Sequence, residues 1–306
     1  MANLYEAVKE WMETSKKTNV KPSTYDRLLR SLELMANYGI SRIPFESVEA
    51  SDIQDYLNRL VDDGYALSTV KKQYHLISAF IDYANANRKL NCLVYKGVNL
   101  PSESSVKKHK REVIAYSKRE QYDLSQVLWT LEHPSYGAAI LMMETGMRVG
   151  EVMALGWDDI DWNRRAVMIR KTAVRIYDRK RVYIQNEPKS FSSKRTIALS
   201  KNAMDLLTDL RRLDDSDSPF VFHDERGDFL TYECLRWPIM KACSKAKVPY
   251  YGQHVFRHTF ATNCYEKGCD VKLLSKFLGH QNVNVTYNVY IHLFGDALEE
   301  MRMIVD

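Results

Sequence analysis

The stretch HVFRHTF, residues 254–260, is the most informative part of the chain for its fold and its chemistry. It sets His254 and Arg257 three residues apart, so both side chains share one face if the segment is helical, and they can point at a common target. A solvated basic face is the more common origin of such a pair. The motif therefore needs partners elsewhere in the chain before it indicates a site.

Two such partners follow downstream. In LGH, residues 278–280, His280 comes directly after a glycine at the expected end of a helix. In TYNVYIH, residues 286–292, Tyr290 follows His280 by ten residues. A lone histidine is more often structural, and the chain has 19 tyrosines, so neither residue stands out by itself.

Two further stretches lie upstream. In TGMRVGE, residues 145–151, Arg148 sits between glycines at the expected start of a helix, and Glu151 lies one turn later, where it can orient the guanidinium group. In PKSFSSKRTI, residues 188–197, Lys189 falls on a turn between two predicted strands, and a hairpin tip can reach into a groove. Taken singly, a surface ion pair and a solvated lysine are the more common interpretations.

The order and spacing of these motifs together are distinctive. An arginine, a lysine, His-x-x-Arg, Leu-Gly-His and a tyrosine ten residues later make the sequence resemble the tyrosine recombinase, or phage integrase, family. The resemblance covers most of the chain and is strongest over residues 140–292. The catalytic set that it implies is Arg148, Lys189, His254, Arg257, His280 and the nucleophile Tyr290, with Glu151 in a supporting role.

The resemblance also implies how the site works. Two arginines can hold the non-bridging oxygens of a phosphodiester and stabilise the developing charge without a metal. His254 would accept the proton of Tyr290, His280 would hydrogen-bond the scissile phosphate, and Lys189 would protonate the leaving 5′ oxygen. The resulting 3′-phosphotyrosine retains the energy of the broken bond, so no ATP, metal or other cofactor is expected. Two rounds of exchange would pass through a Holliday junction.

Helical spacing dominates the first 100 residues. Apolar residues recur at helical intervals from Leu4, and Pro22, Ser23 and Asp26 resemble a capping box at the start of a second helix. Two more helices are expected over residues 51–63 and from Ser68 onwards. The pattern predicts a compact helical bundle over residues 1–100, and by resemblance this is the core-binding, DNA-binding domain.

Residues 101–114 have the composition of a linker. Four basic residues follow its serine-rich start: Lys107, Lys108, Lys110 and Arg111. A solvated charged linker and a tether that lies on DNA phosphates are equally compatible with the charge alone.

Residues 115–306 form the expected catalytic domain. Helical pattern runs to about residue 155 and resumes near residue 202, while residues 166–199 favour about three strands with a tight turn at 178–180. The fold class is therefore mainly α: an N-terminal helical bundle plus a mixed α+β catalytic domain with a small antiparallel sheet. The apolar pattern of residues 293–304 predicts a C-terminal tail helix.

Composition is compatible with this assignment without requiring it. The net charge of +5 permits a nucleic-acid partner, and the 45% of hydrophobic residues can form a sizeable core. The five cysteines are odd in number and no pair has zinc-site spacing, so no metal site is expected and reduced thiols in a cytoplasm fit best. No apolar run approaches the length that crosses a bilayer.

The resemblance implies double-stranded DNA as the partner and a homo-tetramer on that DNA. The tail would be exchanged between protomers, the alternative being packing on its own domain. The stretches KPSTY, residues 21–25, and PKS, residues 188–190, look closest to integrases of phages and conjugative transposons. Integration and excision of a mobile element, transposition and a directionality factor are therefore expected. Many such integrases carry an arm-binding domain first; we expect that it has been removed here, the alternative being a compact recombinase.

Two other functions remain open on the sequence alone. A type IB topoisomerase uses similar residues to relax supercoils, and it would join no two duplexes. A non-enzymatic helical DNA-binding regulator would form no covalent complex with DNA.

Overall fold

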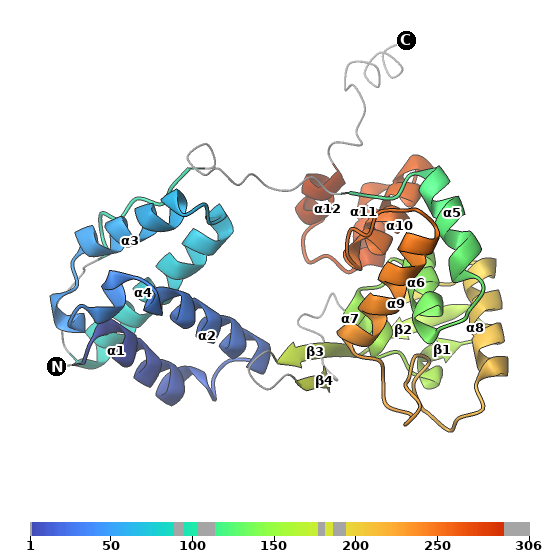
Figure 1. Ribbon diagram of the computed structural model, residues 1–306, viewed down its shortest axis with the longest axis horizontal. Helices are drawn as coiled ribbons and strands as arrows, with labels where there is room; N and C mark the ends of the chain where they lie inside the picture. Colours follow the sequence, from blue (N-terminus) through green and yellow to red (C-terminus); the bar gives the residue numbers. More distant parts are fainter. Residues whose placement is uncertain (1, 89–94, 103–113, 177–180, 186–193, 291–306) are drawn as a thin grey trace, which may run out of the picture. The chain divides into compact units, whose positions relative to one another are not determined.

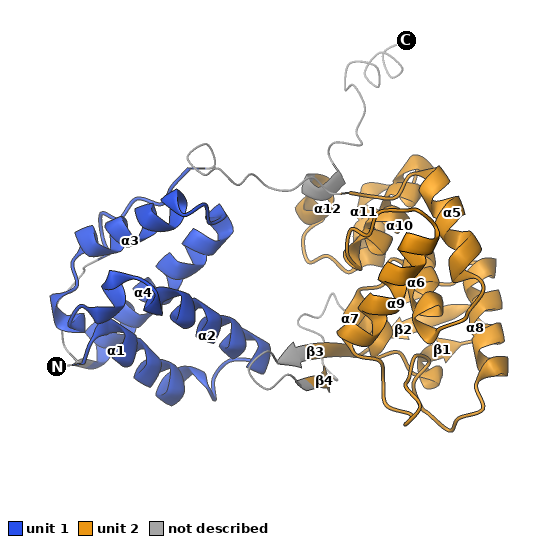
Figure 2. Ribbon diagram, viewed as in Figure 1, with its two compact units in different colours: residues 1–112, 175–181 blue, residues 113–174, 182–306 orange. Residues whose placement is uncertain are grey.

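The computed structural model describes residues 2–88, 95–102, 114–176, 181–185 and 194–290 (Figure 1). The chain divides into two compact units (Figure 2). Unit 1 comprises Met1–Glu112 and Arg175–Arg181, and unit 2 comprises Val113–Val174 and Val182–Asp306. No helix within the described ranges is long and apolar enough to span a membrane.

The described residues of unit 1 form four α-helices. They are α1 (Leu4–Trp11), α2 (Pro22–Ala36), α3 (Ala50–Asp62) and α4 (Leu67–Arg88), and a π-helical turn, Met12–Lys16, extends α1. Asn3 caps α1: its side chain accepts from the Glu6 amide, and the Glu6 carboxylate accepts from the Asn3 amide. The helices enclose one apolar core, in which Trp11 and Phe80 pack edge to face at 5.9 Å.

The start of α2 differs from the predicted capping box. Lys21 is the N-cap residue and makes no side-chain cap, while Pro22 occupies the first helical turn. Asp26 is buried and pairs with Arg30 at 2.5 Å. A proline in the first turn has its φ already set for the helix and has no N–H to satisfy, so the helix begins there without help from Ser23.

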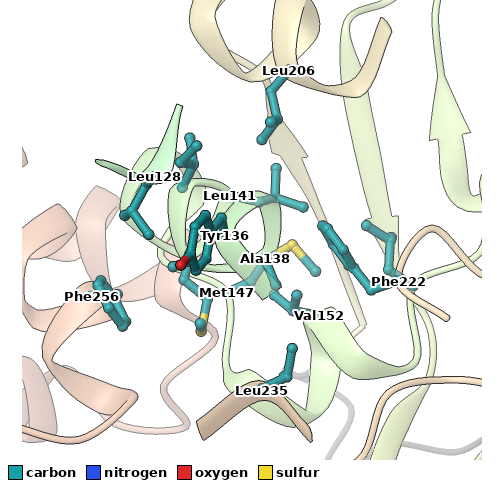
Figure 3. Packing of buried hydrophobic residues seen from close by; sticks show 14 of the residues in the cluster. Leu128, Tyr136, Ala138, Leu141, Met147, Val152, Leu206, Phe222, Leu235 and Phe256 are labelled. Atoms are coloured by element: carbon teal, nitrogen blue, oxygen red, sulfur yellow. The ribbon is translucent and has the colours of Figure 1, made fainter. Parts of the chain in front are cut away.

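Unit 2 is built around α6 (Pro134–Thr145), which is buried along most of its length. Figure 3 shows its side chains Tyr136, Ala138 and Leu141 among apolar residues of the surrounding helices. These helices include α5 (Lys118–Leu128), α8 (Lys201–Leu213), α9 (Tyr232–Lys245) and α10 (His254–Glu266). The unit also contains α7 (Val149–Met153), α11 (Val271–Leu278) and α12 (Val283–Tyr290). An α-helix that is apolar all round is stable only in such a position.

The described strands form two small sheets. β1 (Ile160–Asp161), β2 (Ala166–Ile169) and β5 (Arg195–Ala198) form an antiparallel sheet in the order β1-β2-β5, with Val167 opposite Ile197. β3 (Thr172–Ile176) pairs with β4 (Arg181–Gln185) in a second sheet. The predicted fold class, mainly α with small antiparallel β structure, is confirmed.

The strand count is higher than the predicted three. β1 has only two residues, too few for a periodic signal, and the segment expected to form one sheet contributes to two. The turn predicted at 178–180 lies outside the described residues.

Candidate active site

Arg148 is placed by a sharp break between two helices. α6 ends at Gly146, whose φ of +65° is left-handed, and a Cβ there would overlap the partly buried ring of Phe260. Arg148 then serves as the N-cap of α7, with its backbone N–H donating to Glu151 Oε2 at 2.8 Å. Its guanidinium Nη1 donates to Glu151 Oε1 at 2.9 Å, so the predicted contact between the two side chains is present.

Arg257 is buried in the first turn of α10, with 5% of its surface exposed. Its Nη1 donates to the carbonyl of Gly146 at 2.7 Å, and its Nη2 donates to the carbonyl of Leu278 at 2.7 Å. A buried cation is costly unless its donors are satisfied. Here two backbone carbonyls accept from the guanidinium group and add no formal negative charge.

His280 lies between Arg257 and the first half of α12. Its Nε2 lies 3.0 Å from Arg257 Nη2, and its Nδ1 lies 2.7 Å from Thr286 Oγ1. A guanidinium group only donates, so Nε2 is the acceptor and the proton of the neutral ring is on Nδ1, donated to Thr286. Burial, then the charges of Arg257 and Arg148, lower the pKa of His280 to about 4, so this ring is neutral near pH 7.

Two more histidines stand on α10 beside these arginines. Partial loss of solvent, then the charges of Arg257 and Arg148, lower the pKa of His254, although this residue is exposed at the start of the helix. The same kind of environment, burial first and then His254 and Arg257, lowers the pKa of His258 to about 4. A neutral His254 is able to accept a proton near pH 7.

Arg195, the first residue of β5, is a member of this cluster that the motif analysis did not assign. Its Nη1 and Nη2 donate to the two oxygens of Glu151 at 2.9 and 2.8 Å, and its Nε donates to the carbonyl of Phe277 at 2.6 Å. Only 7% of its side chain is exposed. Its one sequence signal is that it directly precedes the strand residues Thr196 and Ile197, which does not reveal a buried partner.

Glu151 is therefore shared by two guanidinium groups. Burial by itself raises the pKa of its carboxyl, but the hydrogen bonds and charge of Arg195, followed by the charge of Arg148, outweigh burial and hold the pKa at about 2. Arg148 and Arg195 pair with the Glu151 carboxylate, and Arg257 adds a third guanidinium group, held by the carbonyls of Gly146 and Leu278. The three positive charges therefore outnumber the one charge of Glu151. Such a cluster suits an anionic ligand.

The C-terminus of α11 connects these groups. The carbonyls of three consecutive residues, Phe277, Leu278 and Gly279, each accept a hydrogen bond from a different arginine, namely Arg195, Arg257 and Arg148. Gly279 is left-handed with φ +66°, as expected for a glycine that ends a helix, and His280 donates its backbone N–H back to Ser275. The negative end of the helix dipole is therefore faced by cations.

The structure brings together Arg148, Glu151, Arg257 and His280 through direct contacts, and it sets His254 beside them. α12 runs to Tyr290, whose side chain lies outside the described part of the chain. The same holds for Lys189 and for the basic residues 107–111. Within the described ranges, no three His, Cys, Asp or Glu side chains are grouped to hold a metal ion.

Known proteins share both the sequence pattern and the fold. The model of the phage integrase family matches residues 117–296. The chain is 28% identical to a tyrosine recombinase XerC-like protein of Caldanaerobacter subterraneus subsp. tengcongensis, over 92% of this chain and 77% of that protein. It is 23% identical to the transposase from transposon Tn916 of Enterococcus faecalis, over 85% of this chain and 67% of the transposase.

A solved structure of the Tn1549 transposon integrase, in complex with a circular intermediate DNA, has a TM-score of 0.80 at 20% identity and covers 99% of this chain and 100% of that one. This likeness shows a shared fold. The family match spans more than half of the chain and includes Arg148, Arg257 and His280, the residues that meet at the end of α11. The protein is a member of the phage integrase family, the tyrosine recombinases.

Proposed function

We propose that this protein recombines DNA at specific sites by cutting one strand with Tyr290 and rejoining the end to a new partner. The observation that carries the proposal is the convergence of Arg148, Arg257 and His280 on the segment that leads directly into α12. α12 begins three residues after His280 and ends at Tyr290. The proposed nucleophile is thus joined by a short stretch of chain to the cationic cluster.

The phosphate would bind at the guanidinium groups. Two of the five N–H groups of Arg148 donate to Glu151 and Gly279, and its side chain is 34% exposed, so donors face outward for a ligand. Arg257 adds charge from a buried position, where the field of a cation is little screened. These groups would stabilise the charge that develops on the non-bridging oxygens during attack.

The proton steps follow from the chemistry of the groups. A free tyrosine has a pKa near 10, so Tyr290 needs a base or nearby cations to form the phenolate. His254, whose pKa is lowered, would accept this proton as the phenolate oxygen bonds to phosphorus. The bond from phosphorus to the 5′ oxygen breaks, and Lys189 would donate the proton that this oxygen takes up.

His280 has to change partners when DNA binds. In the structure its Nε2 accepts from Arg257, so in this arrangement that nitrogen offers no proton to a phosphate. A phosphate that draws the donors of Arg257 would free Nε2, and its negative charge would favour a protonated ring. His280 would then donate to the phosphate through Nε2 while Nδ1 keeps its bond to Thr286.

The wider assignment rests on the family and its members. The solved relatives include a Tn1549 transposon integrase with circular intermediate DNA and a lambda integrase tetramer bound to a Holliday junction. We infer that this chain likewise acts as a homo-tetramer on double-stranded DNA through a Holliday junction, with exchange of the tail in residues 293–304. It would integrate and excise a mobile element in the cytoplasm, with a directionality factor setting the outcome.

The two units would have different roles in recombination. Unit 1 would form the DNA-binding domain, with a boundary near residue 100, and unit 2 would form the catalytic domain from residue 115. The basic residues of the intervening linker, Lys107, Lys108, Lys110 and Arg111, would lie on DNA phosphates. Phosphate contacts of this kind supply affinity without reading the DNA sequence.

A nicked suicide substrate tests the nucleophile directly. When the short strand beyond the cut diffuses away, the covalent adduct accumulates and is seen on a denaturing gel. We expect Tyr290→Phe to bind DNA but form no adduct. Tyr287→Phe is the matched control, since Tyr287 lies one helical turn earlier in α12, and it should still form the adduct. An adduct with Tyr290→Phe, lost in Tyr287→Phe, would transfer the role to Tyr287.

The products distinguish recombination from its rivals. Joined strands from two different duplexes identify a recombinase, whereas relaxation of supercoils without joined products identifies a topoisomerase. The absence of any covalent complex with the wild-type chain would identify a DNA-binding regulator.

A further inference from the structure

Arg195 joins β5 both to the end of α11 and to the carboxylate that pairs with Arg148. It is nearly buried, and its guanidinium fork is placed bidentately on Glu151. The bond from Nε to the Phe277 carbonyl fixes the plane of the fork. A Cβ on Gly279 would lie 3.1 Å from this side chain, so the glycine also leaves the space that Arg195 occupies.

Each carboxylate oxygen of Glu151 accepts one hydrogen bond from Arg148 and one from Arg195. Oε1 accepts from Arg148 Nη1 and Arg195 Nη1, and Oε2 accepts from the Arg148 backbone N–H and Arg195 Nη2. Arg148 therefore touches Glu151 through one guanidinium nitrogen only. Its other guanidinium terminus is held by the Gly279 carbonyl.

We propose that Arg195 is a positioning residue for strand cleavage, which holds the Glu151 carboxylate so that this carboxylate does not capture Arg148. Arg195 takes up the acceptor capacity that a bidentate pair with Arg148 would use. This proposal rests on the proposed function, in which Arg148 binds the scissile phosphate.

Electrostatics supports the same conclusion. Of the two arginines, Arg195 contributes more than Arg148 to keeping the pKa of Glu151 low. Without Arg195, the full negative charge of a buried carboxylate would act on Arg148 alone. The carboxylate would then weaken the attraction of Arg148 for the phosphate. It would also allow Arg148 to rotate onto Glu151, away from the phosphate.

A purely structural role makes a different prediction. If Arg195 only ties β5 to α11, its loss should lower stability, and removal of Glu151 as well should not restore activity. If Arg195 restrains a carboxylate, removal of that carboxylate should relieve the defect. The sign of the interaction between the two substitutions therefore separates the two roles.

The test measures the first-order rate of adduct formation on the nicked suicide substrate, the dissociation constant for DNA, and the melting temperature. The variants are Arg195→Gln, Glu151→Gln, the double variant with both changes, and Arg195→Lys. Arg170→Gln is the matched control, since Arg170 also pairs with a nearly buried carboxylate, that of Asp159, outside the cluster.

We expect Arg195→Gln to form the adduct about 100-fold more slowly, with DNA affinity within about threefold of wild type, because a misplaced catalytic group costs rate more than binding. The double variant should be at least about fivefold faster than Arg195→Gln alone. Arg195→Lys, which keeps the charge but loses the bidentate fork, should fall between Arg195→Gln and wild type. Arg170→Gln should cleave within about twofold of wild type.

Three results would overturn the proposal: Arg195→Gln cleaves within twofold of wild type, its rate falls only in step with its DNA affinity, or the double variant is no faster than the single one. If Arg195→Gln does not fold, the double variant is compared with Glu151→Gln. Equal rates then support the proposal, and a much slower double variant refutes it. The wild-type adduct is the internal reference, since its absence would refute the proposed function itself.

Discussion

Replacement of Gly150 by alanine tests how closely the site depends on the contact between α7 and β3. Gly150 lies inside α7, where alanine has the better intrinsic propensity by about 1 kcal/mol. From helix propensity alone, Gly150→Ala should therefore stabilise the protein. The surroundings predict the opposite, because β3 passes directly over this position.

The size of the effect follows from two distances. An added Cβ would lie 2.6 Å from the backbone oxygen of Ala173 and 2.8 Å from Thr172 Oγ1. A carbon and an oxygen normally approach to about 3.3 Å, so the strand has to retreat by about 0.7 Å. Overpacking of this kind costs about 1–3 kcal/mol, and after the helix-propensity gain of about 1 kcal/mol we expect a net loss of about 0–2 kcal/mol.

Activity should fall more than stability. α7 carries Arg148 at its N-cap and Glu151 one turn later, so strain between α7 and β3 displaces the cationic cluster. A displacement of about 1 Å can cost 100-fold in rate, and we expect Gly150→Ala to form the covalent adduct about tenfold more slowly.

The assays are thermal unfolding and adduct formation on the nicked substrate. Gly39→Ala serves as the control, because no atom lies within 4 Å of an added Cβ there, and it should leave both measurements nearly unchanged. A Gly150→Ala protein that melts at or above the wild-type temperature and cleaves at the wild-type rate would refute the argument, since α7 and β3 would then have room to separate at no cost.

Two further predictions concern the histidines. Burial and nearby cations lower the pKa of His258 and of His280 to about 4, whereas a histidine in the unfolded chain has a pKa near 6.5, so the unfolded chain takes up protons first as the pH falls. Between pH 7 and pH 5 the free energy of unfolding should therefore fall by on the order of 1 kcal/mol for each histidine, after allowance for solvent screening. A melting temperature that is flat over this range would contradict the assignment. Thr286→Val removes the acceptor of the His280 ring and should slow adduct formation about tenfold, while Thr286→Ser retains the hydroxyl and the rate; equal rates for the two variants would show that the bond has no role.

Local sequence signals predicted where two residues of the candidate site lie relative to helix ends. Arg148 at a helix start and His280 after a helix end were both predicted from glycines that stand where a helix begins or stops, and the structure confirms both positions. Such signals depend on a few neighbouring residues. They are therefore readable in one sequence, and their combined spacing was enough to identify the family.

Long-range contacts were not predictable in this way. Arg195 meets Glu151 across 44 positions of the sequence and Phe277 across 82. Nothing near Arg195 in the sequence distinguishes it from a solvated residue such as Lys194, which is exposed. Its burial is a consequence of the fold, because β5 places it next to the end of α11.

The surroundings of Arg257 were not predictable from its motif either. Its motif also matched a solvated basic face, and the structure excludes that alternative for Arg257 because the residue is buried. Its hydrogen bonds go to the carbonyls of Gly146 and Leu278, which come from two different helix ends. No pattern of side chains in the sequence encodes a backbone acceptor.

The choice of backbone acceptors is itself suited to the chemistry. Each guanidinium of the cluster must be fixed in orientation, and a carboxylate on each would do this while cancelling the positive charge that the phosphate requires. A carbonyl group fixes a donor through a partial charge only. The carbonyls of Phe277, Leu278 and Gly279 hold three arginines and add no formal negative charge to the cluster. Glu151 is the carboxylate that pairs with Arg148 and Arg195. An end of a helix with a glycine in the left-handed conformation presents such carbonyls in a row. If α11 continued past Gly279, its carbonyls would accept hydrogen bonds within the helix and would not be available to the arginines. The helix end at Leu-Gly-His therefore has a physical role just before the segment that leads to Tyr290.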